Sequence, residues 1–239
     1  MNNNVTDKAL HKIAFEPLHD KVHKRLQNAL MSAHFQPGSQ VSLRATAKML
    51  GVSVMTVRVA VLRLVAEKAL QQVSNRNFFV PKIDQAEFEE IVFLRTTLEG
   101  IGAEFAASRR SQKQLASLKL TAKKLTQAGL DGDAETYLRA NRNFKLGVVE
   151  AAQAPVLKDL VISLWVRFGP FMSHFTKNIH HQTDSDYQNE IVAAIASRDG
   201  ATAREIIVRD ITEGAEFLRE CAGFELRSDL RTDDELCNR

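Results

Sequence analysis

The sequence has few of the features that mark membrane, secreted or metal-binding proteins. Its longest apolar stretches, 160–166 and 191–196, are far shorter than the roughly 20 residues that cross a bilayer. The polar first residues do not resemble a signal peptide. The two cysteines, Cys221 and Cys237, lie near the end without metal-binding spacing. We therefore expect reduced thiols and a cytoplasmic protein with no membrane partner.

Motifs of common enzymes are also missing from the sequence. It has no glycine-rich phosphate loop, no Gly-x-Ser-x-Gly and no supported pair of a nucleophilic cysteine and a histidine. His174, His180 and His181 are candidate zinc ligands, but their spacing fits no common structural site and favours polar helix-end or loop residues. We therefore expect that the protein is not an enzyme and uses no cofactor. The alternative is a helical enzyme that uses Lys145, Asp210 and these histidines as acid–base groups.

Charge is divided unevenly along the chain, although the net charge is only +3. Residues 1–82 carry 12 lysines and arginines against 4 acidic residues, whereas residues 83–239 carry 20 against 25. The first segment is therefore at +8 and the second at −5. A basic module joined to a mildly acidic one predicts that the first contacts a polyanion. Charge alone does not distinguish nucleic acid from a membrane surface.

The basic segment has the pattern of three helices followed by a hairpin. Apolar residues with three- and four-residue spacing predict a first amphipathic helix: Leu18, Val22, Leu26, Ala29, Leu30 and Ala33. Pro37-Gly38 breaks the chain, and Ser42 can cap a short helix over 43–50 that Gly51 ends. Ser53 can cap a third helix. Two helices joined by a glycine-centred turn predict a helix-turn-helix.

Two short β-type runs follow this helix-turn-helix. They cover 71–74 and 77–81 and flank Asn75-Arg76. Runs of this length separated by two turn-forming residues predict a β-hairpin. The hairpin would be the wing of a winged helix-turn-helix.

The ordered series resembles the DNA-binding domain of GntR-type regulators over residues 17–81. The matching segments are Pro37-Gly38, 50–53, 56–58, 62–64 and Glu67 with the hairpin ending at Val80. The resemblance implies DNA contacts at the start of the second helix, on the third helix and at the wing tip. These residues are Arg44, Ser53, Val54, Met55, Thr56, Arg58, Asn75 and Arg76.

By this resemblance Arg58 is the guanine-contacting arginine, which suits bidentate pairing to O6 and N7 in the major groove. A phosphate contact and a structural role remain alternatives for it. Ser53 and Thr56 would bind phosphates at a helix N-terminus, and the wing tip would border the minor groove.

The third helix also departs from the family pattern. Val54 and Met55 stand where relatives usually have an arginine after the cap, and Val59 replaces a usual glutamate. Losing a strong base contact predicts a different or less G-rich operator. Val54 and Met55 would contact thymine methyl groups or have no role in base selection.

The second half has helical patterning throughout and no β pattern. Asp84 with Glu87 and Ser111 with Gln114 form capping signals before long amphipathic segments. Turns are expected at 131–133, 153–155, 169–170 and 199–200. These signals predict six helices in an antiparallel bundle. The expected class is therefore mostly α, with a winged helix-turn-helix and a C-terminal all-α bundle.

The order of these helices resembles the ligand-binding domain of the FadR branch of GntR regulators. The matching residues are Leu94-Arg95 with Leu98-Glu99, Phe144 after Asn141, 191–195, and 198–200 followed by Ala203. Most members of that branch bind a metal there through an aspartate and three histidines. The corresponding residues here are Asn141, Lys145, Gln188 and Asp210. A protonated lysine and neutral amides are poor ligands, so we expect no metal.

The substituted position has alternative interpretations. Lys145 and Asp210 would face each other, with Asn141 and Gln188 as neighbours, either as a buried ion pair that fills the old metal position or as a solvated set. In the functional interpretation Lys145 and Arg95 attract an anionic effector such as a carboxylate. Trp165 belongs to the core or to the pocket wall.

Together these patterns predict a transcriptional regulator, acting as a repressor, whose homodimer binds a palindromic DNA operator and responds to a small anionic metabolite. The alternative is an architectural, non-specific DNA binder without an effector. The expected organisation is a flexible N-terminus over 1–16, a DNA-binding domain over 17–82, an effector and dimerisation domain over 84–222, and a flexible tail over 223–239.

Overall fold

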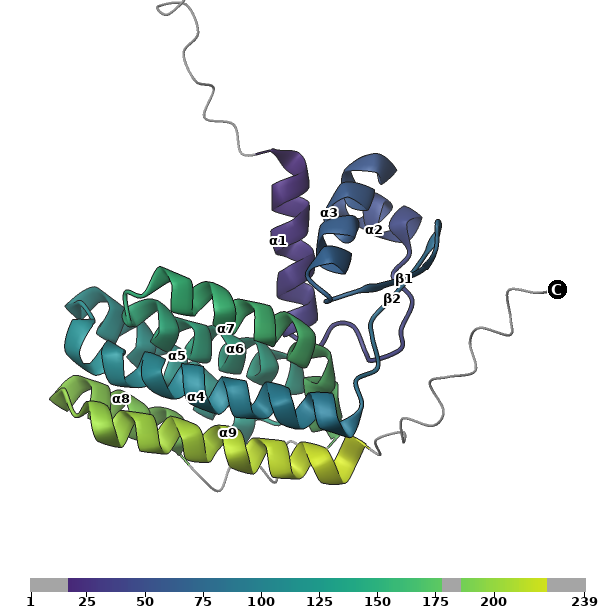
Figure 1. The fold of residues 1–239 in the computed structure, drawn as a ribbon. Coiled ribbons are helices and arrows are strands. Elements are labelled where there is room, and N and C mark those ends of the chain that lie inside the picture. The colour runs from purple at the N-terminus through teal and green to yellow at the C-terminus, as the bar shows by residue number, and fades with distance from the viewer. Residues whose placement is uncertain (1–16, 178–185, 223–239) are drawn as a thin grey trace, which may run out of the picture.

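The structure is a computed structural model that describes residues 17–177 and 186–222. The expected flexible ends at 1–16 and 223–239 lie outside the described residues, as do His180, His181 and Cys237. The described chain forms a small domain that stands on a larger bundle of helices (Figure 1).

The small domain is a winged helix-turn-helix, as the sequence predicts. Its helices are α1 (Leu18–Met31), α2 (Leu43–Leu50) and α3 (Val54–Ala66). Ser42 caps α2 by accepting a hydrogen bond from the Ala45 amide, and Ser53 caps α3 through the Thr56 amide. Gly51 ends α2 with a φ of 65°, a left-handed conformation that glycine adopts without a steric penalty. The turn that sets the two helices at an angle is therefore encoded locally.

The wing is an antiparallel pair of strands, β1 (Gln71–Ser74) and β2 (Asn77–Phe79). Asn75 and Arg76 form the expected two-residue connection. Phe78 is fully buried and anchors the hairpin to the core of the domain, whereas Val73 is exposed. A bridge between Gln40 and Phe79 adds a short third segment beside the hairpin.

The larger part is an all-α bundle of the expected order. Its elements are α4 (Gln85–Arg109), α5 (Gln112–Leu130), α6 (Ala134–Ala151), α7 (Pro155–Phe168), a 3₁₀ helix η1 (Gly169–Lys177), α8 (Tyr187–Ser197) and α9 (Gly200–Ala222). Asp84 caps α4 through the Glu87 amide, and Ser111 with Gln114 forms a complete capping box at α5. α4 and α9 pack side by side along their lengths (Figure 1).

The α-helix α7 ends at Phe168, directly before Gly169-Pro170, as the sequence predicts, but the chain then stays helical where a turn is expected. Gly169 has a φ of −51° and a ψ of −41°, and the chain continues as η1. Proline has no amide proton for an i→i−4 hydrogen bond, so the α-helix ends there. The following residues pack their aromatic side chains into the bundle, which keeps the segment helical.

One buried hydrophobic cluster spans the small domain and part of the bundle. Val22, Leu26 and Leu30 of α1 belong to the same buried cluster as Val161 and Trp165 of α7. The winged helix-turn-helix is therefore packed against the bundle and is joined to it by more than the short connector at 81–84. Among the described residues, no single helix has the length and apolarity to cross a membrane; α2 and α3 meet that test only together, with a bend of 117° between them.

Candidate DNA-binding surface and effector cavity

The first turn of α3 presents a small apolar patch to solvent. Val54 and Met55 are exposed, Met55 to 66%, and Val59 lies one turn further along the exposed side. On the opposite side Val57 and Val61 are fully buried. The helix is thus fixed by its inner face, and its outer face is open to a partner. This patch occupies the position where the family pattern has a charged base contact.

Ser53 and Thr56 close the start of α3 with their hydroxyl groups. Ser53 Oγ accepts from the Thr56 amide at 3.0 Å and lies 2.8 Å from Thr56 Oγ1. Both hydroxyls lie at the helix N-terminus, where free amides favour an anion. This arrangement suits the phosphate contact that the resemblance implies.

Arg58 connects α3 to the wing. Its Nη1 donates a hydrogen bond of 2.9 Å to the backbone carbonyl oxygen of Asn75 at the wing tip. The structure thereby brings two of the predicted DNA-contacting residues together, although they lie 17 positions apart. Arg76 at the tip and Arg44 on α2 are exposed. A guanidinium has five N–H donors, so Arg58 keeps donors for a base after this contact.

The bundle contains a small cavity of about 40 Å³ between α4, α6, η1 and α9. Arg95, Asn141, Lys145 and Asp210 all line it, as the sequence predicts for the substituted metal position. The Lys145 ammonium donates to the Asp210 carboxylate. The Lys145 side chain is only 3% exposed and that of Asp210 is 29% exposed, so the pair lies at the edge of the bundle interior.

Arg95 is held in one orientation on the cavity wall. Its Nε donates to Glu99 Oε1 at 2.7 Å, and its guanidinium carbon lies 4.3 Å from the ring centroids of both Trp165 and Phe168. Trp165 Nε1 also donates to Glu99 Oε1, at 3.1 Å. Two aromatic faces and one carboxylate stabilise this buried cation. Trp165 therefore acts in the core behind the cavity and not on its wall.

Glu99 is a buried residue that is not among the site residues predicted from the sequence. It is fully buried, and its Oε2 has no hydrogen-bond partner. A buried carboxylate normally needs a cation, and Arg95 one helical turn earlier supplies it. An i, i+4 pair of arginine and glutamate is a detectable sequence signal, but its burial is visible only in the fold.

Two further residues differ from the expected set. Gln188 does not line the cavity; its amide donates to Thr126 Oγ1 of α5 at 3.0 Å, because α8 turns this face toward α5. Tyr137 does line the cavity and was not predicted. Burial raises the pKa of the Tyr137 hydroxyl well above its usual value, and the negative charge of Asp210 adds to the shift. Tyr137 is therefore a neutral hydroxyl at any physiological pH.

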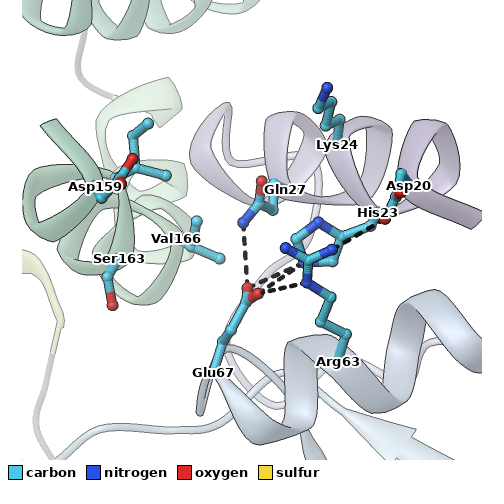
Figure 2. A pocket seen from close by; sticks show the side chains of 10 residues that line it. Asp20, His23, Lys24, Gln27, Arg63, Glu67, Asp159, Ser163 and Val166 are labelled. Carbon is cyan, nitrogen blue, oxygen red and sulfur yellow. Dashed lines mark hydrogen bonds and ion pairs between the residues drawn. The ribbon is translucent and has the colours of Figure 1, made fainter. Parts of the chain in front are cut away.

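A larger cleft of about 570 Å³ separates part of the small domain from the bundle (Figure 2). Its walls are α1, α3 and α7. Glu67, at the end of α3, accepts hydrogen bonds from Gln27 Nε2 at 3.2 Å and Arg63 Nε at 3.3 Å, and its carboxylate lies 3.0 Å from His23 Nε2. These contacts fix α1 to α3. Asp159 and Ser163 of α7 line the opposite wall.

Comparison with known proteins agrees with this two-part architecture. Residues 18–80 match the model of the gntR family of bacterial regulatory proteins, and residues 90–213 match that of the FCD domain. The chain belongs to the GntR family of regulators that carry an FCD domain. Both families consist of transcriptional regulators and not of enzymes.

Individual relatives support the assignment. The chain is 27% identical over 201 residues to the HTH-type transcriptional regulator McbR of Escherichia coli K12, covering 83% of this chain and 91% of that protein. The solved structure of E. coli McbR/YncC superposes with a TM-score of 0.80 at 26% identity, over 86% of this chain and 99% of that one. A GntR-type regulator from Rhodococcus sp. RHA1, at 17% identity, has a TM-score of 0.68 over 87% and 99% of the two chains, and shares the fold.

The FCD domain of this chain does not fit the metal that the resemblance to the FadR branch implies. Its position holds one carboxylate, Asp210, already paired with an ammonium, while Asn141 is a neutral amide and Gln188 points elsewhere. Within 17–177 and 186–222, no three histidine, cysteine, aspartate or glutamate side chains come together as a metal site. A Lys145 ammonium in place of a histidine would repel a divalent cation.

Proposed function

We propose that this GntR-family regulator, a member of the FadR branch, binds a palindromic operator as a cytoplasmic homodimer and represses transcription. The observation that carries the proposal is the surface that runs from the exposed first turn of α3 through the half-buried Arg58 to the exposed wing tip at Asn75. A helix that enters the major groove beside a wing at the neighbouring groove uses such a surface. A small module alone makes too few contacts for operator-level affinity, so two copies are required.

Exposed apolar side chains on the bundle support the homodimer. Phe93 of α4 is 68% exposed, and Val156 and Leu160 of α7 are also more than half exposed. α4 and α7 are neighbours in the bundle. Apolar side chains on adjacent helices favour burial against a second copy.

The operator is tested by selecting bound duplexes from a random pool with the full-length protein. We expect an inverted repeat with half-sites about one helical turn apart, or a multiple of that spacing. Enrichment of no sequence, together with steep loss of binding at higher salt, would instead support the architectural DNA binder. Fusion of the selected operator to a reporter promoter then tests repression: loss of this protein should raise expression.

We propose that the FCD domain binds a small anionic effector, such as a carboxylate, at Arg95 and Lys145. Both cations are buried and line the same cavity, and each has a single carboxylate partner among the described residues, Glu99 and Asp210 respectively. Since a buried ammonium needs an anion, an incoming carboxylate can replace Asp210 at Lys145. The cavity of about 40 Å³ has room for only a few water molecules, at roughly 10–15 Å³ each. Binding therefore requires Asp210 and α9 to move outward.

The effector is tested by a thermal-shift screen of small mono-, di- and tricarboxylates against the full-length protein. A ligand that binds only the folded state raises the melting temperature. We expect the shift to disappear in Lys145→Met. A ligand that stabilises both proteins equally would show that it binds elsewhere.

A further inference from the structure

The last turn of α1 rests directly on the junction between α7 and η1. A Cβ atom added at Gly169 would lie 2.5 Å from both the Leu30 carbonyl oxygen and the Met31 Cα. These neighbours are backbone atoms, so they cannot move aside as a flexible side chain can. Gly169 is thus required by the close approach of α1 and not by its own dihedral angles, which are ordinary for a helix.

Arg142 of α6 holds the same end of α1 from the other side. Its Nη1 donates to the Asn28 carbonyl oxygen at 2.8 Å and to Ser32 Oγ at 2.5 Å. The last turn of α1 contains no basic residue of its own. A positive charge at a helix C-terminus is favourable, and here the bundle supplies it. Partial burial is the main cause that lowers the pKa of Arg142.

The two elements that hold α1 also form the effector cavity. Phe168 directly precedes Gly169, and it lines the cavity with Met172 and Phe175 of η1. On α6, Asn141 and Lys145 line the cavity, while Arg142 points toward α1. The cavity wall and the contacts to the end of α1 therefore lie on the same two elements, with no loop between them.

Beyond its last turn, α1 packs on α7 through one face, with Val22 and Leu26 in the same buried cluster as Val161, and borders a cleft on another face. Asp20, Lys24 and Gln27 of α1 line this cleft of about 570 Å³ together with Asp159 and Ser163 of α7 (Figure 2). α1 is fastened to α3 through Glu67, so α1 carries the helix-turn-helix with it. The C-terminal end of α1 lies next to the bundle, and the rest of the small domain extends away from it (Figure 1).

From these contacts we propose that Arg142 and Gly169 form the pivot through which the effector cavity sets the tilt of the DNA-binding domain. This inference rests on the proposed function of the cavity and of α3. Widening the cavity shifts α6 and the 168–175 segment, which turns α1 toward or away from the cleft. In a dimer, a tilt of each small domain changes the distance between the two recognition helices, on which operator affinity depends.

Reciprocity of coupled sites gives the test. If the cavity biases the DNA-binding domain, operator DNA must in turn alter the cavity wall. Trp165, the single tryptophan, is buried behind Arg95 on that wall and reports on it through its emission. Saturating full-length protein with the selected operator should shift Trp165 emission and change amide exchange in 168–175. In Arg142→Ala the operator should still bind, but both changes should be lost.

Arg139→Ala is the matched control. Arg139 lies one turn earlier on α6, is exposed and pairs with Glu135, so its removal should leave both signals as in the unaltered protein. An operator that binds tightly without changing Trp165 emission or the 168–175 exchange would overturn the pivot and leave the proposed function standing. Unchanged signals in Arg142→Ala would overturn it as well.

A second experiment needs no DNA and holds even if no operator is found. Lys145→Met perturbs the cavity directly and should alter amide exchange in residues 28–32 by at least roughly fivefold, the lower end of typical couplings. The effect should vanish in an Arg142→Ala or Gly169→Ala background, because the last turn of α1 has then lost its close contact with α6 or with Gly169. Equal effects of Lys145→Met in all three backgrounds would mean that the sites act independently.

Discussion

Arg58 Nη1 lies 2.9 Å from the backbone carbonyl oxygen of Asn75, so the helix and the wing that face DNA are tied together before any DNA is bound. This contact reduces the freedom of the wing, which in turn lowers the entropy that is lost on binding. If Arg58 also contacts a base, as we propose, the residue has one role within the protein and one toward DNA.

Removing the Arg58 side chain should impair specific binding more than general binding. We expect Arg58→Ala to cost roughly 1–3 kcal/mol on the selected operator and to relax base preference at one position of each half-site. Arg63→Ala is the control on the same helix, because Arg63 pairs with Asp20 and Glu67. It should weaken all duplexes alike. Fluorescence anisotropy with specific and scrambled duplexes measures both, and equal losses for Arg58→Ala would reduce that residue to a phosphate contact.

The protein should sediment as a dimer at micromolar concentration. Phe93→Glu places a charge among the exposed apolar side chains of α4 and α7. It should shift the equilibrium toward monomer with a matching loss of operator affinity. Leu120→Glu changes a residue of similar exposure, 65%, on α5, and should leave the dimer intact. A monomer with undiminished operator binding would contradict the proposed assembly.

The purified protein should contain no stoichiometric zinc, nickel or manganese, and chelators should leave operator binding unchanged. The reason is that the Lys145 ammonium and its bond to Asp210 occupy the position of a metal ligand pair. Elemental analysis by mass spectrometry measures the metal content. A tightly held metal with His174 or His180 among its ligands would show that this interpretation of the cavity is wrong.

Two substitutions at the Lys145–Asp210 pair can separate the effect of the Lys145 charge on ligand binding from its effect on the stability of the fold. Lys145→Met leaves a partly buried carboxylate without its cation and should lower the free energy of unfolding by several kcal/mol, roughly 3–5 for a fully buried pair. Adding Asp210→Asn removes that charge and should restore the melting temperature. The double variant should still fail to respond to a carboxylate, because the ammonium is missing. Restored stability together with a restored ligand response would exclude Lys145 from the effector site.

Local chemistry in the sequence determined the elements of this protein. Ser42, Ser53, Asp84 and Ser111 cap helices where their hydroxyl or carboxylate groups predict caps, and Gly51 supplies the left-handed turn. Each of these interactions spans only a few residues. The wing connection at 75–76 and the turns between the bundle helices have the same origin.

The tertiary structure decided which side chains meet. It directs Gln188 to Thr126 rather than into the cavity, brings Arg58 to Asn75 and buries Glu99 between Arg95 and Trp165. It also lets the chain remain helical beyond Gly169-Pro170.

These contacts depend on the rotation and crossing of whole helices, which are set by the packing of many apolar residues at once. A sequence pattern identifies the buried face of a helix but not the neighbour that will cover it. The need for glycine at position 169 is the clearest case, because it arises only when α1 closes on the end of α7.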